Sequence, residues 1–227
     1  MIDPDETIET LPGGLRIIQK RRGYRYSVDA LLLAEFAQVD KGDVIIDLGT
    51  GCGILPLLLC QKGEPERVIG VEVQEELFRL AMRNIQINSL SHLIEIVNKD
   101  IRNLKGEFRA GSFDLAVSNP PFRPPTWGRI SRETQRAIAR HEIAITLPEL
   151  VETAQYLLKV GGRLSLVYPV VRLADLIYQL RSLGLEPKTL QLVHHRRGEE
   201  ASLALLEAVK GAGVELKVLP PKIIEDF

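Results

Sequence analysis

The sequence predicts an α/β protein built on a doubly wound, Rossmann-like sheet, mostly parallel, with an antiparallel pair of strands at its C-terminal edge. Two observations predict this fold. From Lys41 onward short apolar runs alternate with helical stretches, and runs such as Val44–Leu48 are almost continuously apolar, as in strands buried on both faces. Alternation of this kind implies right-handed crossovers and a sheet covered by helices on both sides. Ligands of such sheets bind at the carboxyl ends of the strands, so residues at these ends are the candidate site.

The elements follow one another along the chain without a low-complexity linker. Residues 1–40 form an N-terminal extension with a turn at Leu11-Pro12-Gly13-Gly14, a short strand at 15–18 and a helix whose candidate N-cap is Ser27. Residues 41–227 form the core, and the whole chain is expected to be a single domain. The expected strands of the core are 44–48, 68–72, 93–97, 113–117, 163–168, 189–194 and 202–209, and its helices are 54–60, 75–88, 147–159 and 171–180. The last two strands have no helix between them, which predicts the antiparallel edge pair.

Composition excludes several classes of protein. The 227 residues are 45% apolar and 26% charged, as in ordinary globular proteins, and no apolar run is long enough to cross a membrane. The acidic start of the chain does not have the pattern of a signal peptide. Cys52 and Cys60 have no partners at metal-binding spacing, so we expect reduced thiols, a cytoplasmic protein and no metal, with a catalytic cysteine as the weaker alternative. The oligomeric state is left open.

A glycine-rich turn joins the strand at 44–48 to the helix that follows it. The segment Asp47-Leu48-Gly49-Thr50-Gly51-Cys52-Gly53 places three glycines at alternate positions, where the chain can turn sharply and a ligand can approach the backbone. A dinucleotide fingerprint would require glycine at position 54, which is Ile54. The spacing is that of Rossmann-like methyltransferases, so we expect the turn to bind S-adenosyl-L-methionine (AdoMet). A tight turn without a ligand is the alternative.

Acidic residues follow the next two strands. Glu72 ends the strand at 68–72, where a carboxylate can accept both hydroxyl groups of a ribose, and Val73 after it is also expected to contact the cofactor. Asp100 follows the strand at 93–97 and can accept from the adenine amino group, with Ile101 against the ring. Taken alone, a solvated glutamate and a helix-capping aspartate are reasonable alternatives. Together with the glycine turn, they predict one cofactor spread over three strand ends.

The strand at 113–117 is followed by Ser118-Asn119-Pro120-Pro121-Phe122. The prolines prevent continuation of the strand, so the chain leaves the sheet there. An amino group conjugated to a ring is a poor nucleophile; the Asn119 side-chain oxygen and the Pro120 carbonyl can accept its two hydrogens and direct its lone pair at a methyl group. Phe122 offers a ring on which a base can stack. The segment predicts methyl transfer to a planar amino nitrogen by positioning and oriented dipoles; a purely structural turn is the alternative.

These motifs make the sequence resemble the bacterial tRNA(Val) adenine-37 N6-methyltransferases, within the wider group of Asn-Pro-Pro-Phe amino-methyltransferases. The resemblance extends over nearly the whole chain and includes the segments 23–33, 139–142 and 200–203. It implies transfer of a methyl group from AdoMet to N6 of an adenosine beside a tRNA anticodon, with the target held by Asn119, Pro120, Pro121 and Phe122. It also implies cofactor contacts from Asp47, Gly49, Glu72 and Asp100, with Tyr26, Ser27 and Asp29 lining the other side.

RNA as a partner would require local basic patches, because the formal net charge is −1. The segment after the catalytic motif holds five arginines against one acidic residue, and we expect RNA contacts from Arg123, Arg129, Arg132, Arg136 and Arg140. Two other basic clusters, at 20–25 and 194–197, are interpreted as ordinary surface charge. Trp127 can stack on a base or hold its loop, and His141 is interpreted as structural.

Three alternative functions remain open at this level. The same chemistry could act on guanine N2 of ribosomal RNA or on a protein glutamine amide, although Phe122 in place of tyrosine disfavours the latter. A binding protein without catalysis on the same scaffold is a second alternative. A nicotinamide-dependent oxidoreductase is disfavoured by Ile54 and by the absence of a proton relay.

Overall fold

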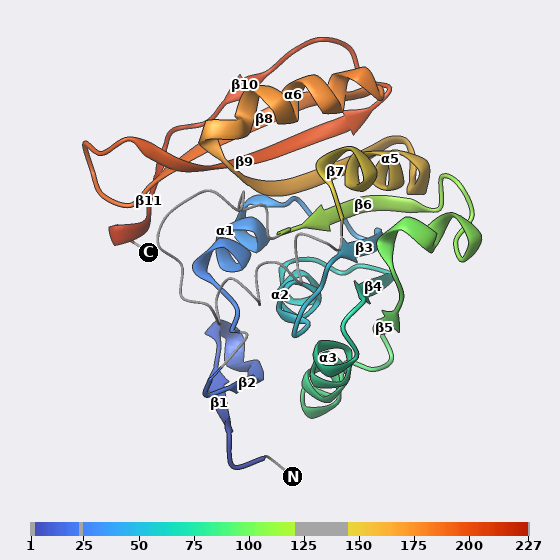
Figure 1. Ribbon diagram of the computed structural model, residues 1–227, viewed down its shortest axis with the longest axis vertical. Coiled ribbons are helices and arrows are strands. Elements are labelled where there is room, and N and C mark those ends of the chain that lie inside the picture. Colours follow the sequence, from blue (N-terminus) through green and yellow to red (C-terminus); the bar gives the residue numbers. More distant parts are fainter. Residues whose placement is uncertain (1–2, 23–24, 121–144, 227) are drawn as a thin grey trace.

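The computed structural model describes residues 3–22, 25–120 and 145–226, and has three layers (Figure 1). Within these residues nine strands form a sheet in the order β10-β8-β9-β7-β6-β3-β4-β5, with β11 also pairing with β8. From β5 to β7 the strands are parallel, and β9 is antiparallel to both β7 and β8. The predicted fold class is therefore confirmed.

The expected core elements are present, with boundaries shifted by a few residues. The strands are β3 (Val44–Leu48), β4 (Arg67–Glu72), β5 (Ile94–Asn98), β6 (Phe113–Ser118), β7 (Leu158–Pro169), β8 (Leu185–His194) and β9 (Ala201–Lys210). The helices are α1 (Val28–Phe36), α2 (Ile54–Lys62), α3 (Glu75–Ile87), α5 (Leu147–Leu157) and α6 (Leu173–Ser182), with short 3-10 helices η1 (Pro12–Gly14), η2 (Ile101–Gly106), η3 (Val170–Arg172) and η4 (Ile224–Asp226). Ser27 is the N-cap residue of α1, as predicted, but its side chain makes no capping hydrogen bond.

Each face of the sheet has its own apolar core. Ile45 packs into the core formed with α1, α2, α3 and the N-terminal strands, whereas the next residue, Ile46, packs into the core formed with η2, α5 and α6. Neighbouring residues of a strand point to opposite faces, so a strand covered on both sides must be apolar throughout. This explains the continuous apolar runs of the sequence.

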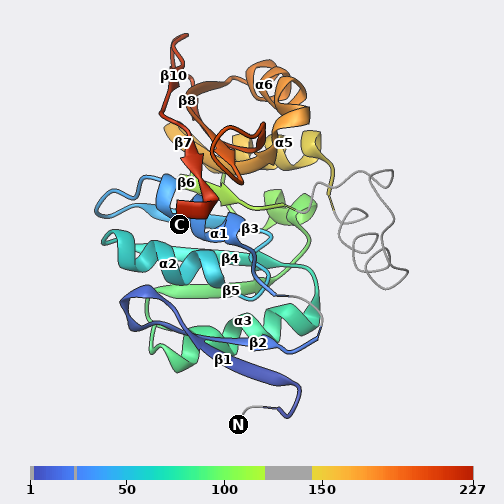
Figure 2. The same ribbon diagram turned by 90° about the vertical axis from the view of Figure 1, so that its left-hand side faces the viewer.

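Two features at the periphery differ from the sequence expectations. The strand predicted at 15–18 is β2 (Arg16–Lys20), and it pairs with an additional antiparallel strand, β1 (Glu6–Thr10). The hairpin lies beside α3 (Figure 2). At the opposite end, β10 (Lys217–Val218) and β11 (Lys222–Ile223) pair with β8, so the antiparallel pair is flanked by two short outer strands. The division into one domain stays a prediction. No helix in the described ranges is long and apolar enough to cross a membrane.

Candidate cofactor and methyl-transfer site

The carboxyl ends of four neighbouring strands lie level with one another. Asp47 of β3 is in register with Gly70 of β4 and Val117 of β6, and Glu72 of β4 is in register with Asn98 of β5. Because these strands are parallel, the segments that follow them emerge at one edge of the sheet. The structure therefore brings together the glycine turn, Glu72, the start of η2 and Asn119, as the sequence predicted.

The glycine turn has a backbone that other residues rarely adopt. The φ angles of Gly49, Gly51 and Gly53 are +90°, +58° and +82°, and a side chain at any of these positions would be strained. The N–H groups of Gly49 and Thr50 both donate to the Val71 carbonyl, at 3.0 and 2.8 Å. A Cβ placed on Gly49 would have no described heavy atom within 4 Å. The turn is thus fixed against β4 while its outer surface is open to a ligand.

Asp47 is a buried carboxylate without a described partner. Its exposed fraction is 0%, and neither of its oxygens accepts a hydrogen bond within the described part of the chain. Burial raises the pKa of the Asp47 carboxyl to about 7; the Thr50 hydroxyl, which lies near the carboxylate but outside hydrogen-bonding geometry, opposes the rise, and the charge of Glu72 adds to it. A buried carboxylate in this condition is costly in the free protein. It is suited to a cationic or hydrogen-bond-donating ligand.

Glu72 supports the turn in addition to facing it. Its side chain is buried, Oε2 accepts from the Gly51 N–H at 2.9 Å, and Oε1 accepts from the Gln74 N–H at 2.8 Å. Burial raises the pKa of this carboxyl, and the backbone hydrogen bonds partly offset the rise. The Asn98 side chain donates to the Glu72 carbonyl at 2.8 Å, which ties β5 to the end of β4. Each carboxylate oxygen has a further lone pair available for a ligand hydroxyl.

Asp100 is satisfied by its own neighbours. It is the N-cap of η2, where Oδ1 accepts from the Arg102 N–H at 2.9 Å, and its carboxylate also accepts from the Arg102 guanidinium at 2.5–3.1 Å. These contacts with Arg102 lower the pKa of Asp100. Val73 is 45% exposed after β4, and half-buried Ile101 packs against the core below η2. Asp100 therefore caps η2, as the structural alternative predicted. Its contact with the cofactor stays a prediction.

The N-terminal residues assigned to the cofactor precede or begin α1. Tyr26 is half-buried, packs against the core that includes Cys52, and donates from its hydroxyl to Glu9 Oε2 at 3.1 Å. Burial, with the Glu9 contact, raises the pKa of Tyr26 to about 12. Ser27 is exposed and Asp29 is half-buried in the first turn of α1. These contacts place Tyr26 against the core that includes Cys52 and against Glu9 of β1; the cofactor contacts of Tyr26, Ser27 and Asp29 stay a prediction.

The predicted methyl-transfer motif begins where β6 ends. Asn119 and Pro120 are half-buried and follow Ser118, whose Oγ donates to the Leu48 carbonyl at 2.6 Å. This bond joins the start of the motif to the residue that precedes Gly49. Sequence reasoning gave Ser118 no role, because a small polar residue at a strand end carries no local signal of a partner 70 residues away. The other predicted residues lie outside the described ranges: Pro121, Phe122, Arg123, Trp127, Arg129, Arg132, Arg136, Arg140 and His141.

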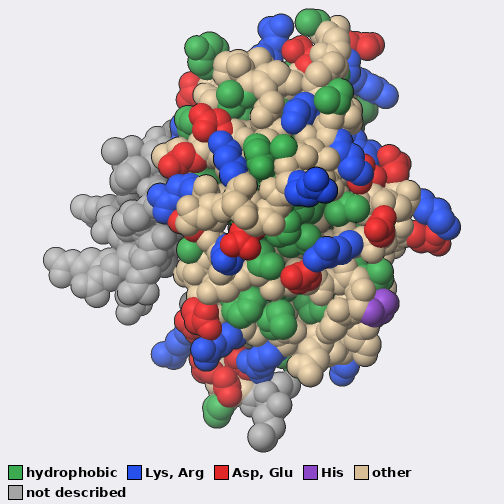
Figure 3. Space-filling view, turned by 90° about the vertical axis from the view of Figure 1, so that its right-hand side faces the viewer, with side chains coloured by type: hydrophobic (Ala, Val, Ile, Leu, Met, Phe, Trp, Pro, Cys, Tyr) green, Lys and Arg blue, Asp and Glu red, His purple; other side chains and the backbone are tan. Residues whose placement is uncertain are grey.

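Three members of the other two basic clusters form ion pairs. Lys20 lies 3.1 Å from Asp5, Arg25 pairs with Glu9, and Arg196 lies 4.0 Å from Glu199. On the face drawn in Figure 3, acidic and basic side chains are interspersed and do not gather by sign. The three ion pairs agree with the interpretation of Lys20, Arg25 and Arg196 as ordinary surface charge. Among the described residues no group of three or more histidine, cysteine or acidic side chains could hold a metal ion.

The geometry fits AdoMet at the glycine turn. AdoMet carries a sulfonium and an ammonium group, and the Asp47 carboxylate, which has no hydrogen-bond partner among the residues the structure describes, is a suitable complement to positive charge. The open surface at Gly49 gives room for a bound group, and Glu72 presents acceptors beside it. Cys52, in contrast, is buried, and burial raises the pKa of its thiol to about 12, which disfavours a nucleophilic role.

Comparison with known proteins identifies the family. Residues 27–172 match the methyltransferase small domain. A Tolumonas auensis protein named tRNA1(Val) (adenine(37)-N6)-methyltransferase is 30% identical over 191 residues, which cover 84% of this chain and 78% of that protein. A Porphyromonas gingivalis protein of the same name is 37% identical over 158 residues, 67% of this chain and 61% of that protein.

Solved structures show the same fold. A predicted O-methyltransferase from Agrobacterium tumefaciens aligns with a TM-score of 0.67 at 24% identity, over 86% of each chain. A T. thermophilus 16S rRNA N2 G1207 methyltransferase in complex with AdoMet and guanosine aligns with a TM-score of 0.62 at 21% identity, over 90% of this chain and 50% of that one. The chain belongs to the methyltransferase small domain family and is an AdoMet-dependent methyltransferase.

Proposed function

We propose that this methyltransferase modifies the exocyclic N6 of an adenosine in RNA, and that its substrate is adenosine 37 of a tRNA(Val). The observation that carries the proposal is the position of Asn119: it starts an Asn-Pro-Pro-Phe segment at a strand end tied through Ser118 to the residue before the glycine turn. The names of the relatives from T. auensis and P. gingivalis support the choice of substrate. We likewise propose that the protein acts in the cytoplasm with tRNA as its partner.

The reaction needs little from the protein beyond binding and orientation. AdoMet supplies an electrophilic methyl group on sulfur, and its transfer to the amino nitrogen releases S-adenosylhomocysteine and a proton. Asn119 Oδ1 and the Pro120 carbonyl accept the two amino hydrogens and hold the nitrogen lone pair toward the methyl group. Asp47 and Glu72 would hold the cofactor at the turn, and Phe122 would stack on the target base, which must leave its own stack to reach the site.

The test is methyl transfer by the purified protein to tRNA, ribosomal RNA and protein fractions assayed separately, with mass spectrometry of the modified products. We expect N6-methyladenosine in tRNA. Asn119→Ala should lower turnover by about 100-fold or more, because oriented acceptors are typically worth that much. AdoMet binding by the variant, measured by calorimetry, should stay within a few-fold of the wild type.

Other outcomes would contradict parts of the proposal. Methylated guanosine in ribosomal RNA or methylated glutamine in protein would support the proposed methyl-transfer chemistry but contradict the proposed substrate. Near-normal turnover by Asn119→Ala would reject the role of that side chain. Absence of transfer to all three fractions, together with AdoMet binding, would favour a binding protein.

RNA contacts from the five arginines at 123–140 stay a prediction, and their neutralisation should flatten the salt dependence of RNA binding.

A further inference from the structure

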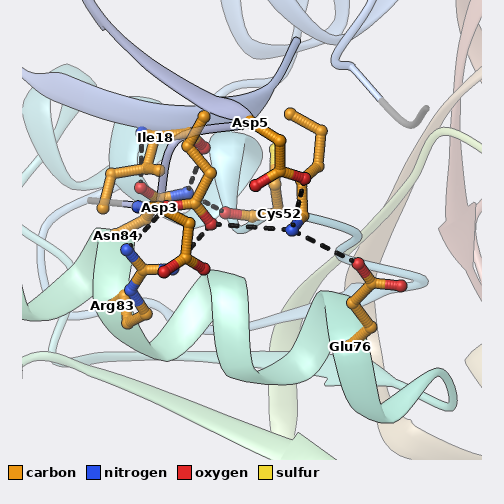
Figure 4. Close-up of polar contacts among 9 residues, drawn as sticks. Asp3, Asp5, Ile18, Cys52, Glu76, Arg83 and Asn84 are labelled. Carbon is orange, nitrogen blue, oxygen red and sulfur yellow. Dashed lines mark hydrogen bonds and ion pairs between the residues drawn. The ribbon is translucent and has the colours of Figure 1, made fainter. Parts of the chain in front are cut away.

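Asn84 of α3 joins two segments that lie far apart in the sequence. Its side chain is 0% exposed; Oδ1 accepts from the Ile18 N–H at 2.7 Å, and Nδ2 donates to the Ile18 carbonyl at 3.1 Å and the Cys52 carbonyl at 2.9 Å (Figure 4). One amide group therefore holds both β2 and the glycine turn. Such a buried network is stable only while each of its members keeps its partner.

The Cys52 carbonyl belongs to the most constrained part of that turn. Gly51 and Gly53 on either side of it both have positive φ angles, +58° and +82°. The Gly51 N–H is held by Glu72, and a Cβ on Gly53 would lie 3.3 Å from the Cβ of Ala81, so the turn lies directly against α3. The turn is thus fixed by Glu72 from β4 and by Asn84 from α3.

Asn88, one helical turn later, makes a similar clasp without reaching the turn. Its Oδ1 accepts from the Arg16 N–H at 2.8 Å, and its Nδ2 donates to the Arg16 carbonyl at 2.7 Å and to the Asn84 carbonyl at 2.7 Å. The two asparagines are four residues apart on one face of the helix, and they bond the backbones of Arg16 and Ile18, two residues apart along one edge of β2. Asn88 therefore contacts only the hairpin and α3 through these bonds, none of which reaches the glycine turn.

The hairpin has a further attachment to α3. Both carboxylate oxygens of buried Glu6 accept from the Arg83 guanidinium, at 2.7 and 2.8 Å, and Lys20 lies 3.1 Å from Asp5 and 3.6 Å from Glu76. The contact with Arg83 lowers the pKa of Glu6. Loss of the Asn84 side chain would therefore leave other contacts between the hairpin and α3.

We propose that Asn84 is a positioning residue for the cofactor: through the Cys52 carbonyl it holds the glycine turn in the conformation that receives AdoMet, and it links this conformation to the docked N-terminal hairpin. The proposal rests on the AdoMet site at the turn. The role differs from that of a structural asparagine because its loss should act on cofactor binding in excess of its effect on folding.

The experiment compares Asn84→Ala with the matched control Asn88→Ala, which removes a similar set of hydrogen bonds from the same helix and strand. We expect both variants to unfold at lower urea concentration. Only Asn84→Ala should weaken AdoMet binding in calorimetry, by about tenfold or more, since small displacements of a positioned group have effects of this order. It should also raise KM for AdoMet while leaving kcat at saturation within a few-fold. Hydrogen exchange should quicken at residues 49–54 in Asn84→Ala and stay unchanged in Asn88→Ala.

Equal losses of AdoMet affinity in the two variants, or unchanged affinity and exchange in Asn84→Ala, would overturn the proposal. If Asn84→Ala does not fold, Asn84→Ser, which is smaller than asparagine and keeps a hydroxyl donor, is measured in its place with the same expectations. Failure of the wild-type protein to bind AdoMet would reject the cofactor site itself. In that case the exchange comparison at residues 49–54 still decides whether Asn84 orders the turn.

Discussion

At the glycine-turn end of the candidate cofactor site, Asp47 is fully buried without a described hydrogen-bond partner, whereas at the β5 end Asp100 is bound by the backbone and guanidinium of Arg102. Their pKa values move in opposite directions for that reason: burial raises the pKa of Asp47, and Arg102 lowers that of Asp100. A ligand that satisfies Asp47 relieves a cost already present in the free protein. A ligand that reaches Asp100 must instead compete with Arg102 for its carboxylate. Cofactor affinity should therefore be concentrated at the turn.

The largest expected effect of this difference is at Asp47. Asp47→Asn keeps the shape of the side chain but removes the negative charge, so AdoMet binding measured by calorimetry should weaken by about 100-fold, as for loss of a charged partner in a buried site. Wild-type affinity should rise as the pH is raised through about 7, because the carboxylate form is the one that complements a cation. A variant that binds as tightly as the wild type would remove Asp47 from the site.

Asp47→Asn should weaken AdoMet binding but raise the free energy of unfolding. A stability measurement is therefore the control for the binding experiment. The folded-state pKa of about 7 lies above the unfolded value, so the folded protein retains a proton that the unfolded chain has lost between about pH 4 and pH 7. The contribution of Asp47 to the free energy of unfolding is therefore most favourable at low pH and is lost as the pH rises through that window. In urea unfolding, the wild type should lose about 2–3 kcal/mol between pH 5 and pH 8 relative to Asp47→Asn. Parallel pH profiles would contradict this.

Glu72 is intermediate between Asp47 and Asp100, because it is buried like Asp47 but accepts hydrogen bonds from backbone N–H groups. Glu72→Gln should weaken AdoMet binding by about tenfold: an amide nitrogen would face the N–H of Gly51 or Gln74, and the turn would lose one of its acceptors. Calorimetry and hydrogen exchange at residues 49–54 measure both consequences. Exchange that is unchanged while binding weakens would indicate that Glu72 acts on the ligand alone.

The same contrast explains what the sequence could predict. The turn and the strand ends around Asp47 and Glu72 follow from local signals, namely continuous apolar runs interrupted by alternate glycines. Strand β1 was missed because Glu6-Thr7-Ile8-Glu9-Thr10 is mostly polar, and the main partner of buried Glu6 is Arg83, 77 residues later. Asn84 was missed for a similar reason, since its partners Ile18 and Cys52 are 66 and 32 residues away. Alternatives for Asp100 could be stated from sequence, but its pairing with Arg102 could not.

The smallest expected effect is at the β5 end. Arg102→Ala leaves the Asp100 contact to the backbone N–H of residue 102 and frees the carboxylate from the guanidinium. If Asp100 accepts from the adenine amino group, AdoMet should bind about two- to threefold more tightly, because an exposed ion pair of modest strength no longer competes. Asp100→Ala is the matched control and should weaken binding by a similar small factor. Weaker binding in Arg102→Ala would instead indicate that the arginine contacts the cofactor itself, whereas unchanged binding in both variants would reduce Asp100 to the cap of η2. The second result would move the affinity still further toward Asp47, whereas the first would place part of it at the β5 end.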